Sequence, residues 1–304
     1  MQIIRIFTTI NTNIVAGFLL AICLLASQTA TANTIKVKQE IVELKSWPGG
    51  TLRLHVNRPE ALAANLPIVL VIPGAKRNAE DYSQYWLPLA RRLPLVTVTI
   101  ECDLKQCPSE YHYNLGGYKL QDGSTPDESQ QFFSVPELAF TAIKQHYQLS
   151  ASGFYLFGHS AGGTFAHLYN LVRPQAPVID VVAANPAFFM LPDPTITYPF
   201  GLKNSGFTES QIGNWLRKST LVMLGDQDLE PRTKALSNSP FAQQQGLAVF
   251  SRGLKFFARS TDWNLAQKQQ PGWQLVIAHG VGHDAEAMAP YAFAHWFLPP
   301  KKQK

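Results

Sequence analysis

The stretch from Gly153 to Gly162, Gly-Phe-Tyr-Leu-Phe-Gly-His-Ser-Ala-Gly, decides the fold of this chain. Its first half is uncharged and rich in aromatic residues, which is typical of a buried strand. Small residues occupy positions 162–164, and apolar residues then recur at helical spacing: Phe165, Ala166, Leu168 and Leu171. The pattern predicts a strand, a sharp turn with Ser160 at its tip, and a helix.

The spacing Gly-x-Ser-x-Gly has a steric reason. A sharp turn holds the serine in a strained backbone conformation and points its hydroxyl out of the sheet. A side chain at Gly158 or Gly162 would collide within that turn, so both positions lack a Cβ. Ser160 is therefore a candidate nucleophile, and the alternative is a glycine-rich turn with an idle serine.

The rest of the chain alternates further strands with helices. Segments 34–43 and 51–56 alternate apolar and polar residues and predict an antiparallel hairpin at a sheet edge. The remaining predicted strands cover 66–72, 95–100, 177–184, 220–224 and 274–278. Strands that alternate with helices imply a mostly parallel sheet with helices on both faces, here in one domain.

A serine hydroxyl is a weak nucleophile, so it needs a base and an anion that orients the base. Two histidines lie in the loop after the last predicted strand, and His283 lies deeper in this loop than His279. Two carboxylates, Asp226 and Asp228, follow the strand 220–224, and their spacing alone does not separate them.

The turn around Ser160, the acidic pair and the phrase Gly-Val-Gly-His-Asp ending at Asp284 resemble the α/β-hydrolase superfamily, especially its exported esterases and polyester-depolymerase-like members. This resemblance implies a triad in the chain order serine, acid, histidine. The family's Gly-x-x-Asp phrase maps to Asp228, and its terminal histidine maps to His283. The family needs no cofactor, and we expect no metal here.

The resemblance also implies an oxyanion hole made of two backbone N–H groups. One belongs to the residue after the nucleophile, here Ala161. The other belongs to the loop after the strand 66–72, where Ala75 is the candidate. Pro73 stands where the family commonly has histidine.

Substrate contacts are predicted from aromatic residues, with the reservation that aromatic residues at helical spacing also build cores. A segment rich in proline, glycine and aromatic residues, 188–215, looks like a cap or lid insert. The candidate pocket residues are Tyr82, Trp86, Phe188, Phe189 and Trp215.

The N-terminus has the pattern of a secretory signal peptide. Arg5 supplies positive charge, an uncharged apolar stretch covers 14–26, and Ala30-Thr31-Ala32 offers small residues at a cleavage site. The apolar stretch is shorter than the ~20 residues of a membrane-spanning helix. We expect cleavage after Ala32, a hydrolase domain over 33–304, and a secreted or periplasmic protein without stable membrane insertion. The alternative is an uncleaved membrane anchor.

Two cysteines, Cys102 and Cys107, remain after that cleavage, and in an exported protein they indicate a disulfide. The alternative is a metal site that adds His112, although these spacings match no strong zinc pattern. The net charge of +5 comes with no basic cluster except the tail 301–304, which argues against a nucleic-acid partner.

These features together favour a serine hydrolase that cleaves a small or polymeric carboxylic ester through an acyl-enzyme intermediate. A peptidase or amidase on the same fold is the second hypothesis, because the triad serves both reactions. A catalytically silent binding protein is the third.

Overall fold

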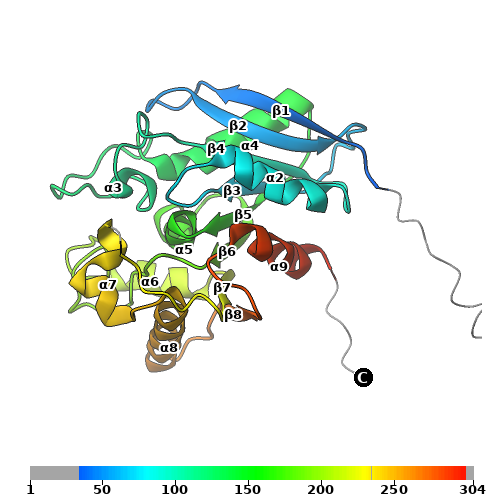
Figure 1. Cartoon of the computed structure of the whole chain (residues 1–304). Coiled ribbons are helices and arrows are strands. Elements are labelled where there is room, and N and C mark those ends of the chain that lie inside the picture. The colour runs from blue at the N-terminus through cyan, green and yellow to red at the C-terminus, as the bar shows by residue number, and fades with distance from the viewer. Residues whose placement is uncertain (1–33, 234, 299–304) are drawn as a thin grey trace, which may run out of the picture. The chain divides into compact units, whose positions relative to one another are not determined.

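A single eight-stranded sheet organises the computed structural model, which describes residues 34–233 and 235–298 (Figure 1). The predicted signal peptide, residues 1–32, lies outside the described residues and stays a prediction. The strand order is β1-β2-β4-β3-β5-β6-β7-β8. The strands are β1 (Val37–Leu44), β2 (Leu52–Pro59), β3 (Ile68–Ile72), β4 (Val96–Glu101), β5 (Phe154–His159), β6 (Val178–Ala184), β7 (Thr220–Gly225) and β8 (Trp273–Ala278).

The predicted sheet is confirmed, including its edge hairpin. β1 pairs antiparallel with β2, and β2 pairs antiparallel with β4. All other pairs, from β4–β3 to β7–β8, are parallel. Parallel strands end at the same edge of a sheet, so the loops after β3, β5, β7 and β8 meet there.

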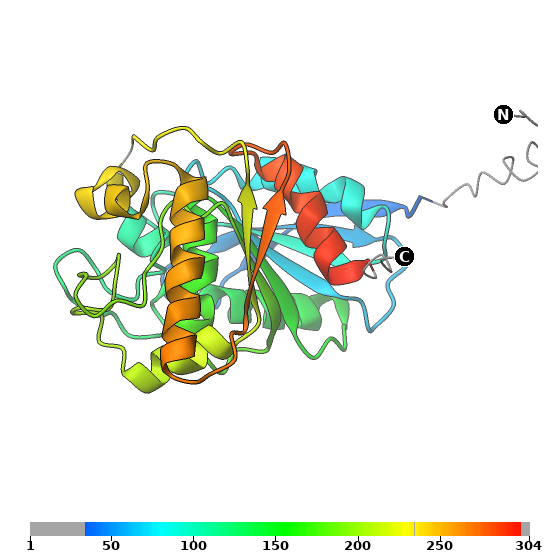
Figure 2. The ribbon, with the colours of Figure 1, turned by 90° about the horizontal axis from the view of Figure 1, so that it is seen from below.

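Helices cover both faces of the sheet (Figures 1 and 2). Side chains alternate along each strand, so Leu70 and Val71 enter different clusters on opposite faces. α2 and α9 cover one face, and α4, α5, α6 and α8 cover the other. The helices are α2 (Ala79–Ala90), α3 (Glu110–Tyr113), α4 (Val135–Tyr147), α5 (Ala161–Val172), α6 (Glu209–Arg217), α7 (Pro240–Gln245), α8 (Val249–Ala266) and α9 (Ala285–Phe297), with short 3₁₀ helices η1 (Phe132–Ser134) and η2 (Ala235–Asn238).

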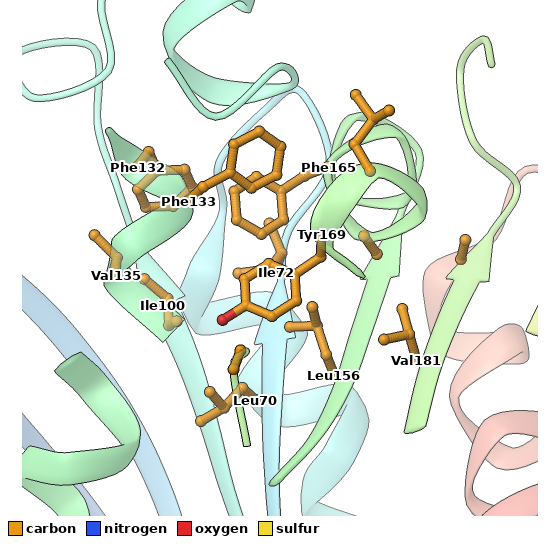
Figure 3. Packing of buried hydrophobic residues seen from close by; sticks show 14 of the residues in the cluster. Leu70, Ile72, Ile100, Phe132, Phe133, Val135, Leu156, Phe165, Tyr169 and Val181 are labelled. Atoms are coloured by element: carbon orange, nitrogen blue, oxygen red, sulfur yellow. The ribbon is translucent and has the colours of Figure 1, made fainter. Parts of the chain in front are cut away.

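Aromatic packing fixes α5 against the sheet. Phe165 and Tyr169 on α5 lie above Leu156 of β5, and Phe133 of η1 stacks on Phe165 with ring centroids 4.5 Å apart (Figure 3). These side chains are fully buried. Removing large aromatic surfaces from water supplies a substantial part of the folding free energy and holds the start of α5 in place.

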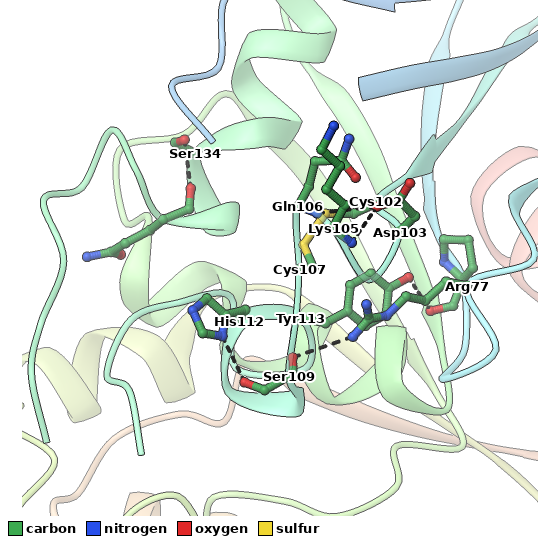
Figure 4. The surroundings of a disulfide bond; sticks show 12 residues. Arg77, Cys102, Asp103, Lys105, Gln106, Cys107, Ser109, His112, Tyr113 and Ser134 are labelled. Carbon is green, nitrogen blue, oxygen red and sulfur yellow. Dashed lines mark hydrogen bonds between the residues drawn. A yellow bond between two sulfur atoms is a disulfide. The ribbon is translucent and has the colours of Figure 1, made fainter. Parts of the chain in front are cut away.

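The predicted disulfide joins Cys102 and Cys107 directly after β4 (Figure 4). His112 instead contacts the Ser109 hydroxyl, 2.8 Å away, so the three residues do not form the alternative metal site. Among the described residues, no group of three or more His, Cys, Asp and Glu is arranged to hold a metal ion. None of the described helices is long and apolar enough to cross a bilayer.

The segment 188–215, predicted as a cap or lid, starts inside the core. Phe189 is fully buried and stacks on Phe256 of α8 with centroids 4.7 Å apart. Farther along, Phe207 stacks on Tyr118 of the long 101–131 loop. The segment ends in α6, whose Trp215 is also fully buried. Its observed packing is therefore against α8 and the 101–131 loop.

Candidate active site

Ser160 lies at the tip of the turn between β5 and α5. Its backbone has φ +59° and ψ −115°, a region that side-chain-bearing residues seldom occupy. A Cβ on Gly158 would come within 1.9 Å of the Gly162 carbonyl oxygen, and one on Gly162 within 2.1 Å of the Ile72 oxygen. The two glycines allow the turn, and the turn exposes the Ser160 hydroxyl.

His283 and Asp228 lie beside this hydroxyl. The Oγ of Ser160 is 2.9 Å from Nε2 of His283, and Nδ1 of His283 is 2.6 Å from Oδ2 of Asp228. Ser160, Asp228 and His283 follow β5, β7 and β8, and His283 lies 123 positions along the chain from Ser160 and 55 from Asp228. This geometry lets the imidazole accept the serine proton at Nε2 while the buried carboxylate holds Nδ1–H.

The structure separates the two candidate acids and the two candidate histidines. Asp226 accepts a hydrogen bond from the Gly280 N–H and contacts Nδ1 of His279 at 3.0 Å. The His279 side chain is 84% exposed. The hydrogen bond with His279 lowers the pKa of Asp226. Asp226 and His279 thus form a surface pair, and only Asp228 reaches His283.

A cavity of about 590 Å³ opens onto Ser160. Its walls come from the loop after β3, α2, α3, the turn at Ser160, the loop after β6, residues 231–233 with η2, and the loop that leads into α9. The lining residues are Gly74, Ala75, Lys76, Asn78, Tyr82, Tyr85, Glu110, Asn114, His159, Ser160, Ala161, Ala187, Pro231, Arg232, Thr233, Ser237, His283, Asp284 and Ala285.

Both residues expected to supply oxyanion N–H groups, Ala75 and Ala161, line this cavity. Ala161 is the first residue of α5, where backbone N–H groups have no acceptor within the helix. The hydroxyl of Tyr113 donates to the Pro73 carbonyl at 2.9 Å, and the Arg77 N–H donates to the Gly74 carbonyl. These bonds fix the loop that carries Ala75.

Solved structures of hydrolases resemble this one. A poly(aspartic acid) hydrolase from Sphingomonas sp. KT-1 matches with a TM-score of 0.81 and 28% identity over 85% of this chain and 98% of that chain. LpqC, a poly(3-hydroxybutyrate) depolymerase from Bordetella parapertussis, matches with a TM-score of 0.80 and 28% identity over 86% of this chain and 91% of that chain. The chain has the α/β-hydrolase fold. No family model and no curated protein matches it.

Of the five aromatic residues predicted to contact substrate, one lines the cavity, and that residue is Tyr82. The other four are fully buried, which corrects the prediction: Trp86, Phe188, Phe189 and Trp215. Their rings pack on other rings in the core, for example Trp86 on Phe157 and Trp215 on Trp273. Large aromatic side chains are as common in a buried core as in a pocket, and these four are buried in the core.

Tyr82 and His159 form a neutral pair at the cavity wall. The Tyr82 hydroxyl is 3.0 Å from Nδ1 of His159, whose ring centroid lies 4.8 Å from that of His283. Burial lowers the pKa of His159 well below its usual value, and the nearby His283 and Arg232 lower it further. Burial also raises the pKa of Tyr82. Both side chains are therefore uncharged near neutral pH, and His283 has an uncharged neighbour.

Arg232 is the main site residue that the sequence interpretation missed. Its guanidinium donates to Oδ1 of Asp228, the carboxylate oxygen that faces away from His283. Arg252, fully buried on α8, donates to the Ala187 carbonyl, and burial lowers its pKa to about 10. Two guanidinium charges therefore lie near the buried Asp228 carboxylate. The four-residue spacing from Asp228 to Arg232 is the only sequence signal for the contact.

The segment 229–248 is a second omission, because it supplies part of the cavity wall. A hydrogen bond joins η2 to α3: the Leu236 N–H donates to the Glu110 carboxylate, 2.8 Å away. Burial raises the pKa of Glu110. α3 itself falls in the 101–131 loop, and loops of that length usually have a functional role.

Proposed function

We propose that this protein is a serine hydrolase that cleaves carboxylic esters. The observation that carries the proposal is the pair of contacts from Ser160 Oγ to His283 Nε2 and from His283 Nδ1 to Asp228. A hydroxyl, an imidazole and a carboxylate in this relation form the arrangement that activates serine for acyl transfer.

In the proposed reaction, Ser160 Oγ attacks the ester carbonyl carbon while its proton moves to Nε2 of His283. The carbonyl oxygen becomes an oxyanion that accepts hydrogen bonds from the N–H groups of Ala75 and Ala161. When the intermediate collapses, the bond to the alcohol oxygen breaks and His283 protonates that oxygen. Water then attacks the acyl-enzyme, gives its proton to His283, and releases the carboxylic acid as Ser160 regains its proton.

A polymeric ester is the substrate we favour. LpqC, 28% identical over 86% of this chain, is a poly(3-hydroxybutyrate) depolymerase. The cavity at Ser160 is partly open and has apolar and polar walls, which suits one unit of a longer chain.

Export is part of the proposal. Residues 1–32 have the composition of a signal peptide, and a disulfide between Cys102 and Cys107 fits an oxidising compartment. Intact mass of the protein recovered from outside the cytoplasm tests this, with Asn33 expected as the new N-terminus. Recovery of the chain with residues 1–32 still attached contradicts cleavage.

The test of the reaction is covalent labelling with a fluorophosphonate, followed by hydrolysis of aryl esters of increasing acyl length. We expect labelling and ester turnover by the wild type, and neither by Ser160→Ala. Ser150→Ala, on an exposed serine outside the cavity, is the matched control. A wild type that is folded but neither labels nor cleaves any ester contradicts the proposal.

Amide hydrolysis is the second candidate, because a further structure at 28% identity is a poly(aspartic acid) hydrolase. The triad chemistry is the same, and only the leaving group differs. Aryl amides with the same acyl groups distinguish the two candidates: amide turnover without ester turnover favours this one.

A further inference from the structure

The structure has a second cavity, of about 570 Å³. The two share α3 as a wall, since Glu110 lines the first cavity and Tyr111, the next residue, lines the second. Consecutive Cα atoms are about 3.8 Å apart, so the two cavities come close together at this helix. The walls of the second cavity come from the 101–131 loop and from the segment 198–206.

Specific contacts hold these two walls together. The rings of Tyr118 and Phe207 stack with centroids 4.6 Å apart, and the Tyr118 hydroxyl donates to the Ser205 carbonyl. The Lys119 ammonium donates to the Asn204 carbonyl at 2.6 Å. The cavity is thus built by side chains from two parts of the chain, as preformed ligand sites are.

The chemistry of the lining is that of rings and hydrogen-bond donors. Tyr111 and Tyr198 present ring surface, and Lys119 keeps two N–H groups beyond the one that it gives to Asn204. Side-chain amides of Gln121 and Asn204 add further donors, and none of the described lining residues is acidic. A ligand that alternates short aliphatic segments with carbonyl acceptors matches this surface.

The Tyr198 hydroxyl is an additional indication. It is buried and has no hydrogen-bond partner within the described part of the chain. Burial raises the pKa of Tyr198, so the hydroxyl keeps its proton and is a donor. A buried polar group without a partner costs free energy, and a carbonyl oxygen of a bound ligand would provide one.

We propose that the second cavity binds a neighbouring segment of a linear polyester while one ester group of the same chain lies at Ser160. The proposal rests on the function proposed above. Each repeat of such a polymer carries one carbonyl acceptor between aliphatic segments, so a chain running past α3 meets Tyr111 and then Lys119. The cavity adds affinity for long substrates without taking part in bond cleavage.

The test is binding of linear oligo(3-hydroxybutyrate) of increasing length to the Ser160→Ala protein, measured by calorimetry. We expect affinity to rise with length up to the span of both cavities. Lys119→Ala and Tyr198→Phe should each reduce the ratio of long-oligomer to short-oligomer affinity by about tenfold, as loss of one hydrogen bond to a charged or buried donor does. Lys255→Ala removes a lysine of α8 that donates to the Gln244 carbonyl of α7, and should leave the ratio unchanged.

Tyr198→Phe separates a lost ligand contact from a folding defect. The hydroxyl that it removes has no partner in the described chain, so the melting temperature should stay the same or rise. Equal affinity of the Ser160→Ala protein for short and long oligomers, or a wild-type ratio in both variants, overturns the second cavity as a polymer site. The proposed function fails separately, through absence of labelling and aryl-ester turnover in the wild type.

Discussion

Arg232 and Asp228, four residues apart in the segment after β7, form an ion pair on the carboxylate oxygen that His283 does not contact. The Asp228 side chain is completely buried, whereas the Arg232 side chain is 20% exposed and lines the cavity. A buried carboxylate needs partners on both oxygens, because an uncompensated buried charge is costly. The guanidinium therefore satisfies one oxygen and leaves the other aimed at the imidazole.

We predict that Arg232→Met lowers the free energy of unfolding by about 1–3 kcal/mol, because it leaves Oδ1 of Asp228 without its charged donor. Since the carboxylate is then free to turn, kcat for an aryl ester should fall more than KM changes. Urea unfolding and steady-state kinetics measure the two effects. Arg217→Met, at the exposed end of α6, is the control, and equal behaviour of the two variants contradicts a positioning role for Arg232.

The two carboxylates after β7 give a matched pair of variants. Asp228→Asn removes the anion that orients His283, and we expect kcat to fall by about 10⁴-fold, as in other serine triads. Asp226→Asn weakens contacts at the surface, with His279 and Gly280, and its kcat should stay within about twofold of the wild type. A larger loss in Asp226→Asn than in Asp228→Asn would reverse the assignment of the acid.

Tyr82→Phe tests the neutral pair at the cavity wall. The variant leaves Nδ1 of the buried His159 without its hydroxyl partner, which should cost about 1–2 kcal/mol of stability. The Tyr82 hydroxyl also lies within 2.8 Å of the point where a Cβ on Gly74 would stand, next to the loop of Ala75. We therefore expect a severalfold decrease in kcat, and Tyr147→Phe, on α4 outside the cavity, serves as the control. Unchanged kcat and stability in Tyr82→Phe would contradict this role.

We predict that the protein loses stability in mild acid because of the buried His167. Burial lowers its pKa to about 3, and its Nε2 accepts the Met190 N–H, so the folded chain holds this imidazole neutral. The unfolded chain takes up a proton below about pH 6.5 and the folded chain does not. The contribution of this group to stability is therefore complete above about pH 6.5 and declines as the pH falls from there toward the folded pKa.

The expected slope is about 1.4 kcal/mol per pH unit for each such histidine, and the buried His159 adds to it. Urea unfolding between pH 6 and pH 5 measures the slope. His167→Gln should lower overall stability and reduce the slope by about 1.4 kcal/mol per pH unit, which corresponds to one proton. Loss of packing alone would leave the slope unchanged. A wild-type slope in His167→Gln therefore contradicts the prediction.

The strand–turn–helix around Ser160 could be predicted because its causes are local. Gly158 is required by the Gly162 carbonyl oxygen within the turn, and the apolar period of 165–171 indicates the helix. The parallel sheet followed from apolar runs that alternate with helices, and the disulfide from an even cysteine count. His283 was favoured over His279 from its place in a loop and from resemblance to a family phrase.

The choice of the acid, the places of the aromatic residues and the cavity walls were decided only by the tertiary structure, because they depend on contacts between distant segments. Asp226 and Asp228 lie in the same short stretch of sequence, so their neighbours along the chain do not distinguish them. The turn after β7 places Asp226 at the surface beside His279 and Asp228 beside His283. Aromatic residues such as Trp86 look alike in a pocket and in a core, and packing alone distinguishes them. The cavity walls from α3 and η2 meet through one hydrogen bond across more than a hundred residues, which no local pattern of apolar and polar residues can specify.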